Sequence, residues 1–446
     1  FFSMLLYKTM GGGLMQLVAY GAQDIYLTGN PQITFFKVVY RRHTNFSMEA
    51  IRQTWAGTKG PGARMVATIS RNGDLVHKTY IALSGGKYKG SVCNPGAASI
   101  ASVECEIGGQ LIDKHYGHWM ETWTELTEQG LDSLHTGQGA DLGGLDSKWW
   151  NASGTEWVPK SKNIGRCTKD LTTTENKIIW GNNFQTMSGM GGVFNGSDIG
   201  GYADNADDSV AQHVPYWVPL YFWFSKNPGL ALPLIALQYH EVKIVLTLSA
   251  DTFVSDGVPS PELWCDYIYL DTDERRRFAQ VSHEYLIEQL QFQSFGDQDT
   301  TKTLNFNHPV KELIWTGEWT SKKGRWEHTS LNIPTAKWGI KLNGHDRFEA
   351  REQHYFAHTQ VYQHHSGTGN LDYTGDTTKE NICVYSFALK PEEHQPSGTC
   401  NFSRIDNAQL VYTNSKTTVL GPINVYAVNY NVLRIMSGMG GLAYSN

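Results

Sequence analysis

Apolar and polar residues alternate in short runs along much of this chain, and this pattern is typical of half-buried β-strands. In the stretch SVECEIGGQLID, residues 102–113, Val103, Cys105 and Ile107 fall on one face and polar side chains on the other. Gly108-Gly109 then provides a turn at the end of the run. We therefore predict an antiparallel hairpin here, with one face against a core.

Two more hairpins are predicted from turn dipeptides. In residues 65–83, Asn72-Gly73 separates two β-branched runs. Asn-Gly fits a tight hairpin because both central positions need positive φ. In residues 338–348, apolar alternation leads into Asn343-Gly344 in the same way. A glycine-tipped hairpin is thus expected in each half of the chain.

A proline motif follows the glycine-tipped hairpin in each half. FSKNPGLALP and FALKPEEHQP both have a Phe, a Pro four residues later and another Pro five residues after that. Proline cannot donate to a sheet ladder, so it sits at strand ends and edges. The shared spacing predicts one corner in two copies of a β-sandwich, that is, a tandem duplication. The motif positions are Phe224, Pro228 and Pro233 in the first copy, and Phe387, Pro391 and Pro396 in the second.

Composition then divides the chain. Residues from about 130 to 214 are rich in Gly, Ser, Asn, Asp and Thr, which indicates a large surface excursion. A helix is predicted over 116–130 from its apolar spacing of three and four, whereas 282–292 fits either a helix or a strand. The predicted organisation is an N-terminal extension at 1–35, a first sandwich at 36–252, a linker at 253–263 and a second sandwich at 264–446.

Charge and cysteine content narrow the function. Charged residues make up 18% of the chain and the net charge is −6, so no basic face for nucleic acid is indicated. The six cysteines are far apart and form no CxxC pair, which favours reduced thiols and a reducing compartment such as the cytoplasm. No apolar run approaches the length of a membrane span.

Candidate chemistry is sparse. His115 and His118 stand near Asp113 and Glu121, but no further ligands follow at a metal-site spacing, so we interpret these histidines as structural. Adjacent carboxylates such as Glu392-Glu393 are best explained as solvated loop residues, since a glycosidase needs two that face one cleft. We therefore predict no catalytic, cofactor-binding or metal-binding residue, and no cofactor.

Five ordered stretches resemble a known family. They are GGGLMQLVAYGAQDIYLTGNPQITFFKVVYRRHTNF (11–46), NPGLALPLIALQYHEVKI (227–244), DYIYLDTDERRRFAQVSHEYLIEQLQF (266–292), FALKPEEHQPSGTCNFSRIDNA (387–408) and NYNVLRIMSGMGGLAY (429–444). The chain resembles the major capsid proteins of nucleocytoplasmic large DNA viruses, such as chlorella viruses and iridoviruses. The resemblance spans the chain from Gly11 onward, apart from 130–214. We expect Met10 to be the natural start, preceded by a nine-residue extension.

The resemblance implies an all-β protein of two tandem eight-stranded jelly-roll sandwiches, with long surface loops and few short helices. It further implies a homotrimer, forming pseudo-hexagonal capsomers that tile an icosahedral virion assembled in the host cytoplasm. The expected partners are neighbouring capsomers, minor capsid proteins and penton proteins. The N-terminal segment would lie on the inner face, near an internal membrane but without direct contact to nucleic acid.

Two groups of residues are site candidates under this reading. Asn151 and Asn195 are sequons in the predicted excursion and are candidates for glycosylation. The stretch DTDERRRF could join domains or subunits through ion pairs, or it could be a charged loop in water. The resemblance favours the contact, whose residues are Asp271, Asp273, Glu274, Arg275, Arg276 and Arg277.

The alternative function is a carbohydrate-binding or carbohydrate-cleaving tandem sandwich. The 14 Trp residues would suit stacking on sugars. That reading requires a cleft lined by aromatic and carboxylate side chains, and the five ordered stretches argue against it.

Overall fold

The computed structural model describes most of the chain from residue 42 onward. The chain divides into two units, Phe1–Asn45 and Phe46–Asn446, and the second contains the strands discussed below. In the first unit, the Asp24 carboxylate accepts a hydrogen bond from the Gly21 amide at 2.7 Å. The described residues are 21–24, 28, 30, 42–84, 91–92, 95–128, 148–150, 157–159, 184, 187–188, 216–250, 258–296, 300–317, 319–322, 325–328, 336–367, 369, 382–414 and 422–444.

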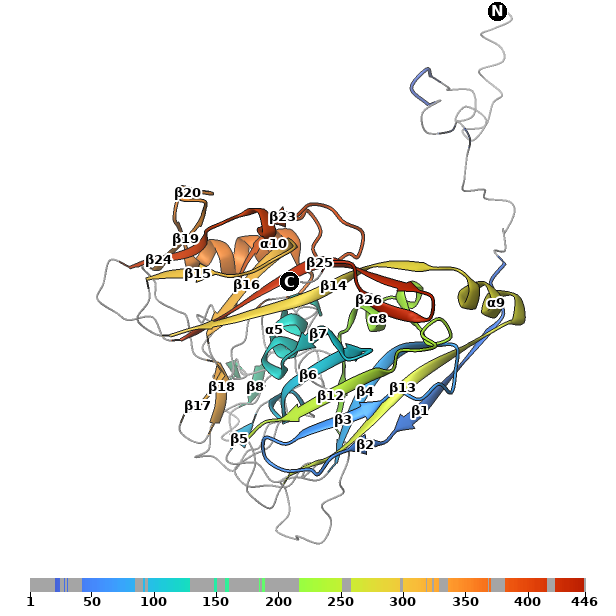
Figure 1. The fold of residues 1–446 in the computed structure, drawn as a ribbon. Helices are drawn as coiled ribbons and strands as arrows, with labels where there is room; N and C mark the ends of the chain where they lie inside the picture. Colours follow the sequence, from blue (N-terminus) through green and yellow to red (C-terminus); the bar gives the residue numbers. More distant parts are fainter. Residues whose placement is uncertain are drawn as a thin grey trace, which may run out of the picture. The chain divides into compact units, whose positions relative to one another are not determined.

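The first sandwich packs two antiparallel sheets face to face (Figure 1). One has the order β1-β13-β4-β10 with β11 beside β4, and the other has the order β2-β3-β12-β6-β7. The strands are β1 (Phe46–Gln53), β2 (Trp55–Ala56), β3 (Arg64–Thr68), β4 (Leu75–Ser84), β6 (Ile100–Ile107), β7 (Gln110–His115), β10 (Tyr216–Pro219), β11 (Leu232–Pro233), β12 (Val242–Leu248) and β13 (Ser260–Leu270). Short helices α4 (Pro95–Ala98), α8 (Trp223–Lys226) and η2 (Pro228–Leu230) and the longer α5 (Gly117–Thr127) connect them.

The second sandwich has the same plan. Its sheets have the orders β14-β25-β16-β22 and β15-β24-β19-β20, with β23, β26 and β21 as short additions. The strands are β14 (His283–Phe295), β15 (Thr301–Leu304), β16 (Pro309–Gly317), β19 (Ala336–Leu342), β20 (His345–Asp346), β21 (Arg351–Glu352), β22 (Ile382–Ser386), β23 (Cys400–Asn401), β24 (Ala408–Asn414), β25 (Ile423–Met436) and β26 (Met439–Leu442). The helical segments are η3 (Tyr355–Thr359), α10 (Gln360–His364) and η4 (Phe402–Arg404).

Two small sheets complete the described strands. β17 (Trp319–Lys322) pairs with β18 (Arg325–His328), which pairs in parallel with β5 (Ser91–Val92). β8 (Lys148–Trp150) pairs with β9 (Trp157–Pro159). None of the described helices is long and apolar enough to cross a membrane.

The two sandwiches correspond strand for strand, which confirms the predicted pair of jelly rolls. Within the described residues, three of the four large sheets have a main path of four strands, and the fourth, β2-β3-β12-β6-β7, has five. Apart from the two-residue β2, each sandwich therefore has the expected eight strands on its main paths. β1, β13, β4 and β10 occupy the places of β14, β25, β16 and β22, respectively. In both copies, consecutive strands of the chain often lie in opposite sheets, as a jelly roll requires.

The glycine-tipped hairpins and the proline motif also fall at equivalent places. The hairpin β6–β7 turns at Gly108-Gly109 with φ angles of 60° and 84°, and β19–β20 turns at Asn343-Gly344 with 51° and 81°. After β10 and β22 the chain passes through Phe224 and Phe387, and each Phe packs against the core of its own sandwich. The chain then pairs again with β4 through β11, or with β16 through β23.

The hairpin predicted at 65–83 is wrong. β3 and β4 lie in different sheets, so Asn72-Gly73 carries the chain from one sheet to the other. Glycine is needed there for space, because a Cβ on Gly73 would lie 2.9 Å from the Cβ of Tyr267. The glycine at position 73 is therefore explained by close packing at a corner of the sandwich, not by a hairpin turn.

The boundary between the sandwiches lies later in the chain than the sequence indicated. β13 pairs with β1 and β4 along nearly its whole length, so residues 260–270 belong to the first sandwich. The chain leaves that sandwich through the helix α9 (Thr272–Gln280) and enters β14. Of the residues 253–263 expected as a linker, 260–263 lie in β13, although their Pro and Ser residues had suggested a loop.

The structure also assigns two stretches near this boundary, one to a strand and one to a helix. The stretch 282–292, which fitted helix or strand, is a strand from His283 onward and belongs to β14. The charged stretch before it is the helix α9. Asp271 caps it by accepting a hydrogen bond from the Thr272 amide at 2.8 Å. Acidic residues occupy the first turn and Arg277 the last, an order that stabilises the helix dipole.

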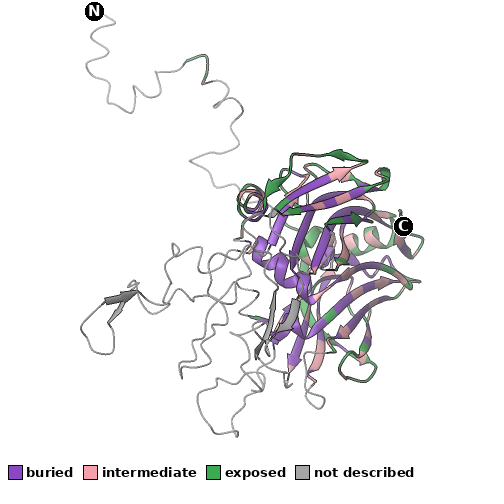
Figure 2. Cartoon of the chain, turned by 90° about the vertical axis from the view of Figure 1, so that its left-hand side faces the viewer, coloured by how far each residue is buried: buried purple, intermediate pink, exposed green. Residues whose placement is uncertain are grey.

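Apolar side chains form one large core in each sandwich, a third cluster between them and a small fourth cluster of Leu75, Ala231 and Ile268. Figure 2 shows buried positions along the strands of both sandwiches. The first core also includes Ile287, Leu433 and Ile435 from the second sandwich. The two sandwiches therefore share buried surface and are not two domains on a flexible tether.

The two glycines at the β6–β7 turn provide a matched test of packing. A Cβ on Gly108 would lie 2.4 Å from His240 Nδ1, whereas a Cβ on Gly109 would meet no atom within 4 Å. Both substitutions by Ala should cost about 1–2 kcal/mol for positive φ. Gly108→Ala should cost a further ~1–3 kcal/mol for steric overlap. Urea denaturation should therefore rank Gly108→Ala as less stable than Gly109→Ala, and equal stabilities would contradict the packing described.

Candidate functional site at the junction of the two sandwiches

The helix α5 fills the space between the two sandwiches (Figure 1). It arises from the predicted helix at 116–130, and ten of its eleven residues are buried. Met120 points into the first core, while Trp119, Trp123 and Leu126 belong to the cluster between the sandwiches. On the other side of this cluster lie side chains from the outer face of the second sandwich: Ile314, Ile382, Val384, Tyr426 and Val428.

The C-terminal end of α5 is capped by the second sandwich. The last carbonyls of a helix have no partner within it. Here the amides of Gly367 and Gly369 donate to the carbonyls of Leu126 and Glu125 at 2.7 and 2.9 Å. A Cβ on Gly367 would lie 2.3 Å from the Glu125 carbonyl, so only glycine allows this approach. The cap is thus a backbone connection between the two halves.

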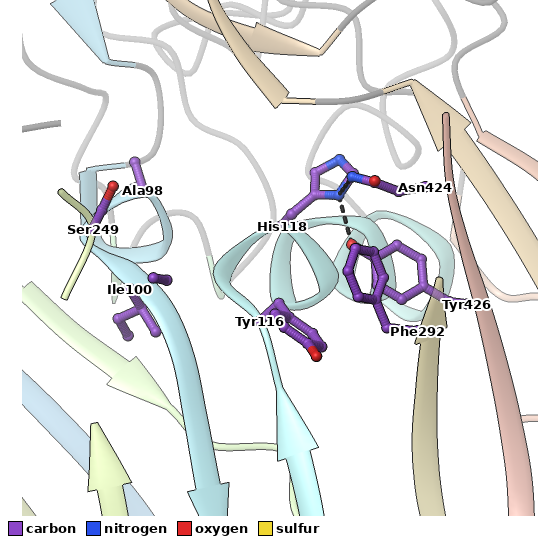
Figure 3. Close-up of a pocket in the computed structure, with 9 residues that line it drawn as sticks. Ala98, Ile100, Tyr116, His118, Ser249, Phe292, Asn424 and Tyr426 are labelled. Carbon is purple, nitrogen blue, oxygen red and sulfur yellow. Dashed lines mark hydrogen bonds between the residues drawn. The ribbon is translucent and has the colours of Figure 1, made fainter. Parts of the chain in front are cut away.

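A pocket of about 180 Å³ opens beside the helix (Figure 3). It is lined by residues of both sandwiches, including Tyr116, Phe292 and Tyr426. His118 Nδ1 lies 2.6 Å from the Tyr426 hydroxyl. Burial lowers the pKa of His118 to about 3, so the imidazole is neutral. Aromatic rings and a neutral histidine suit packing rather than proton transfer.

The histidines considered as metal ligands have protein partners instead. His115 Nε2 lies 2.8 Å from Asp113 Oδ2, and the other oxygen of Asp113 accepts from the Leu290 amide of β14 at 3.0 Å. Asp113 thus links the sandwiches. Across the described part of the chain, no three His, Cys, Asp or Glu side chains are grouped as metal ligands.

Two buried charges and one partly exposed charge connect the halves through the proline motifs. Lys226, in the first motif, lies 2.8 Å from Glu288 on β14. Lys311, on β16, lies 2.6 Å from the other oxygen of Glu288 and also donates to the Pro391 carbonyl in the second motif. Burial alone would raise the pKa of Glu288, but the two lysines outweigh it and lower this pKa to about 2. We call Lys226, Glu288 and Lys311 the charge triad.

A second charged group lies next to the glycine cap. The buried side chain of His365 is 3.1 Å from Glu312 and 3.1 Å from Glu392. Burial would lower the pKa of His365, but the two carboxylates raise it to about 9. His365 is therefore a cation at neutral pH. It precedes Ser366, whose hydroxyl donates to the Thr127 carbonyl at the end of α5 at 2.6 Å.

The charged stretch at 271–277 makes one ion pair outside its own helix within the described residues. Arg275 donates from two nitrogens to Asp74 Oδ2, at 3.0 and 3.2 Å, and so ties α9 to the first sandwich. Arg277 pairs with Glu274 within the helix at 3.6 Å. Asp273 and Arg276 are exposed. A subunit contact through this surface stays a prediction.

Other candidates from the sequence have diverse outcomes. Asn151 and Asn195 lie outside the described residues. Glu392 and Glu393 do not face one cleft together, since Glu392 contacts His365 and Glu393 contacts the exposed Lys390 at 2.8 Å. Sequence reasoning missed the charge triad and His365. For Lys226 and Pro391, the sequence feature that could have indicated a role was their position within the repeated proline motif.

The charge triad should control acid stability. The Glu288 pKa is lower in the folded state than its ordinary value, so its contribution is full above about pH 4.5 and is lost as pH falls toward 2. Glu288→Gln should remove this pH dependence. It should also cost about 3–5 kcal/mol at neutral pH, because Lys311 stays buried without a counter-charge.

The matched control is Glu284→Gln on the same strand, whose ion pair with Arg434 is about half exposed on both sides. It should cost less than about 1 kcal/mol. Both variants are to be compared by chemical denaturation at several pH values. Equal effects would show that the triad adds nothing beyond a surface pair.

His365 should give the opposite pH dependence. Its pKa is higher in the folded state, so its stabilising effect is full below about pH 6.5 and fades as pH rises toward 9. His365→Gln should lower the melting temperature at pH 6.5 and flatten its decline between pH 6.5 and 9. The exposed His345→Gln should change neither. An unchanged alkaline slope in His365→Gln would exclude this role.

Comparisons with known proteins agree with this architecture. Residues 34–271 match the family model described as major capsid protein N-terminus, and residues 274–441 match that for large eukaryotic DNA virus major capsid protein. The models meet at α9, where the strands also place the boundary.

Relatives match over nearly the full chain. The major capsid protein of Pyramimonas orientalis virus is 48% identical, over 98% of this chain and 100% of the relative. That of Paramecium bursaria Chlorella virus 1 is 39% identical with the same coverage. Among solved structures, VP54 of PBCV-1 aligns with a TM-score of 0.67 and 34% identity, covering 93% of this chain and all of the other.

Two jelly rolls with equivalent sheets, joined by a buried helix, are thus matched in sequence and structure over almost the whole length. The chain belongs to the family of major capsid proteins of large eukaryotic DNA viruses.

Proposed function

We propose that three copies of this chain form a pseudo-hexagonal capsomer and that such capsomers tile the faces of an icosahedral shell. The observation that carries the proposal is the strand-for-strand equivalence of the two sandwiches. Three chains then provide six similar sandwiches around one axis. A closed ring of this kind needs only one kind of repeated contact between copies.

The shared core supports the same proposal. A capsomer works as a tile only if the two sandwiches of each chain keep a fixed arrangement. The buried α5, its glycine cap and the charge triad all connect the two halves. A structure similar to this chain, at 35% identity and a TM-score of 0.65, is the quasi-atomic model of the PBCV-1 virus capsid.

The work we assign to the chain is assembly rather than catalysis. Its partners would be its own copies, neighbouring capsomers, and minor capsid and penton proteins. It would reside in the virion after assembly in the host cytoplasm, near an inner membrane and without contact to nucleic acid. The charged helix α9 and glycosylation at Asn151 and Asn195 remain part of the proposal.

The carbohydrate-binding alternative depended on tryptophans available to sugars. Trp119, Trp123, Trp223, Trp315 and Trp338 are buried in the cores or in the junction. These five tryptophans therefore serve packing. Trp217 and Trp264 are partly exposed, and it is the match to major capsid proteins over the whole chain that counts against the alternative.

Light scattering and negative-stain imaging of the purified full chain test the proposal directly. We expect a particle of three 50.0 kDa chains, about 150 kDa, with a hexagonal outline. A stable 50.0 kDa monomer at native salt would overturn the trimer.

A further inference from the structure

One sheet face in each sandwich has an equivalent in the other, but the described residues cover only one of the two. The outer face of β14-β25-β16-β22 packs against α5 and is buried. The equivalent outer face of β1-β13-β4-β10 carries Tyr80, Trp217 and Trp264, which are partly exposed. The rings of Trp217 and Trp264 lie 6.0 Å apart, so they form one aromatic surface.

The strand register shows that these residues occupy matching positions. On the covered face, Ile314 lies between Tyr426 on β25 and Val384 on β22. On the other face, Tyr80 lies in the same way between Trp264 on β13 and Pro219 on β10. Trp264 thus holds the place of Tyr426, whose ring lies 5.0 Å from that of Trp119 on α5.

The helix also has an equivalent. α5 follows the β6–β7 hairpin, and the continuous segment η3–α10 follows β19–β20 and the short β21. Each has one side against its own core, through Met120 in α5 and through Phe356 and Ala357 in η3. The opposite side of α5 is buried against the other sandwich. In η3–α10, Tyr362 is 88% exposed and His358 is exposed.

We propose that η3–α10 of one copy packs on the outer face of β1-β13-β4-β10 of the next copy, bringing Tyr362 against Tyr80, Trp217 and Trp264. In this contact, η3–α10 covers a sheet face of another chain in the way that α5 covers the equivalent sheet face of its own chain. This inference rests on the proposed trimer and identifies the surfaces that hold it together.

The placement of the two surfaces fits a head-to-tail contact. In Figure 1, α10 and the β1–β13 edge lie on opposite sides of α5. The two surfaces are different, so the contact is heterologous, and such contacts form closed rings when the rotation between copies closes. Aromatic side chains are also the residues most enriched where protein interfaces hold their binding energy.

Charge substitution tests the contact. Trp264→Lys and Tyr362→Asp each place a charge in the buried interface, and each should weaken trimer formation at least tenfold in mass photometry across a dilution series. The double variant places opposite charges across the contact and should recover part of the loss. Tyr444→Asp, an exposed tyrosine elsewhere, should leave the trimer intact.

A crosslinking experiment guards against misfolded variants. With Tyr80→Cys and Tyr362→Cys in the same chain, a short bis-maleimide should produce covalent trimers, and either single variant should not. Thermal melting of all variants establishes that they fold. A wild-type monomer would overturn the proposed function itself. A wild-type trimer that tolerates both charged variants and forms no crosslink would leave that function standing and overturn this contact.

Discussion

The burial of one helix between two sandwiches is the constraint on which the rest of the structure depends. α5 is covered on nearly all sides, and a large apolar side chain moved from water into such a site contributes about 1.5–3 kcal/mol. A covered helix must still satisfy its terminal carbonyls, and the second sandwich provides that through its glycine loop. Packing and hydrogen bonding therefore fix the same arrangement of the two halves.

The buried charges add specificity to this apolar contact. Apolar surfaces alone tolerate small shifts, but Glu288 and Lys311 are buried, and they avoid a large cost only because Glu288 lies between Lys226 and Lys311. The triad joins a residue of the first proline motif to a strand of the second sandwich, and Lys311 reaches the second motif. Repeated motifs that are far apart in the sequence thus meet at one place.

Local patterns in the sequence were sufficient for elements whose causes are local. The β6–β7 hairpin, α5 and the duplicated proline corner depend on alternation, helical spacing and backbone limits of Gly and Pro, which can be seen in a few residues. The corner at Asn72-Gly73 could not be distinguished from a hairpin, because its glycine is required by Tyr267, almost two hundred residues later. The cap signals of α9 were present at Asp271 and Arg277, but the charge run suggested a loop.

The junction was harder to predict because its partners are distant. Nothing near Glu288 in the sequence indicates that two lysines will surround it, and His365 gains its charge from carboxylates 53 and 27 residues away (365 − 312 and 392 − 365). Such groups become visible only when the fold brings strands together. The family resemblance supplied the double jelly roll, but the boundary at α9 required the pairing of β13.

The pairing of β1 with β13 also sets an order of events during synthesis. In the described structure β1 is the edge strand of its sheet and its sheet partner is β13. Phe46 pairs with Leu270, so β1 cannot form its ladder until residue 270 has been synthesised. Until the ribosome has made that stretch, β1 presents an unpaired edge, which is prone to association with other chains. Once β13 emerges, the first sandwich can close before β14 exists. The nascent chain would then offer a nearly finished surface on which the second sandwich folds.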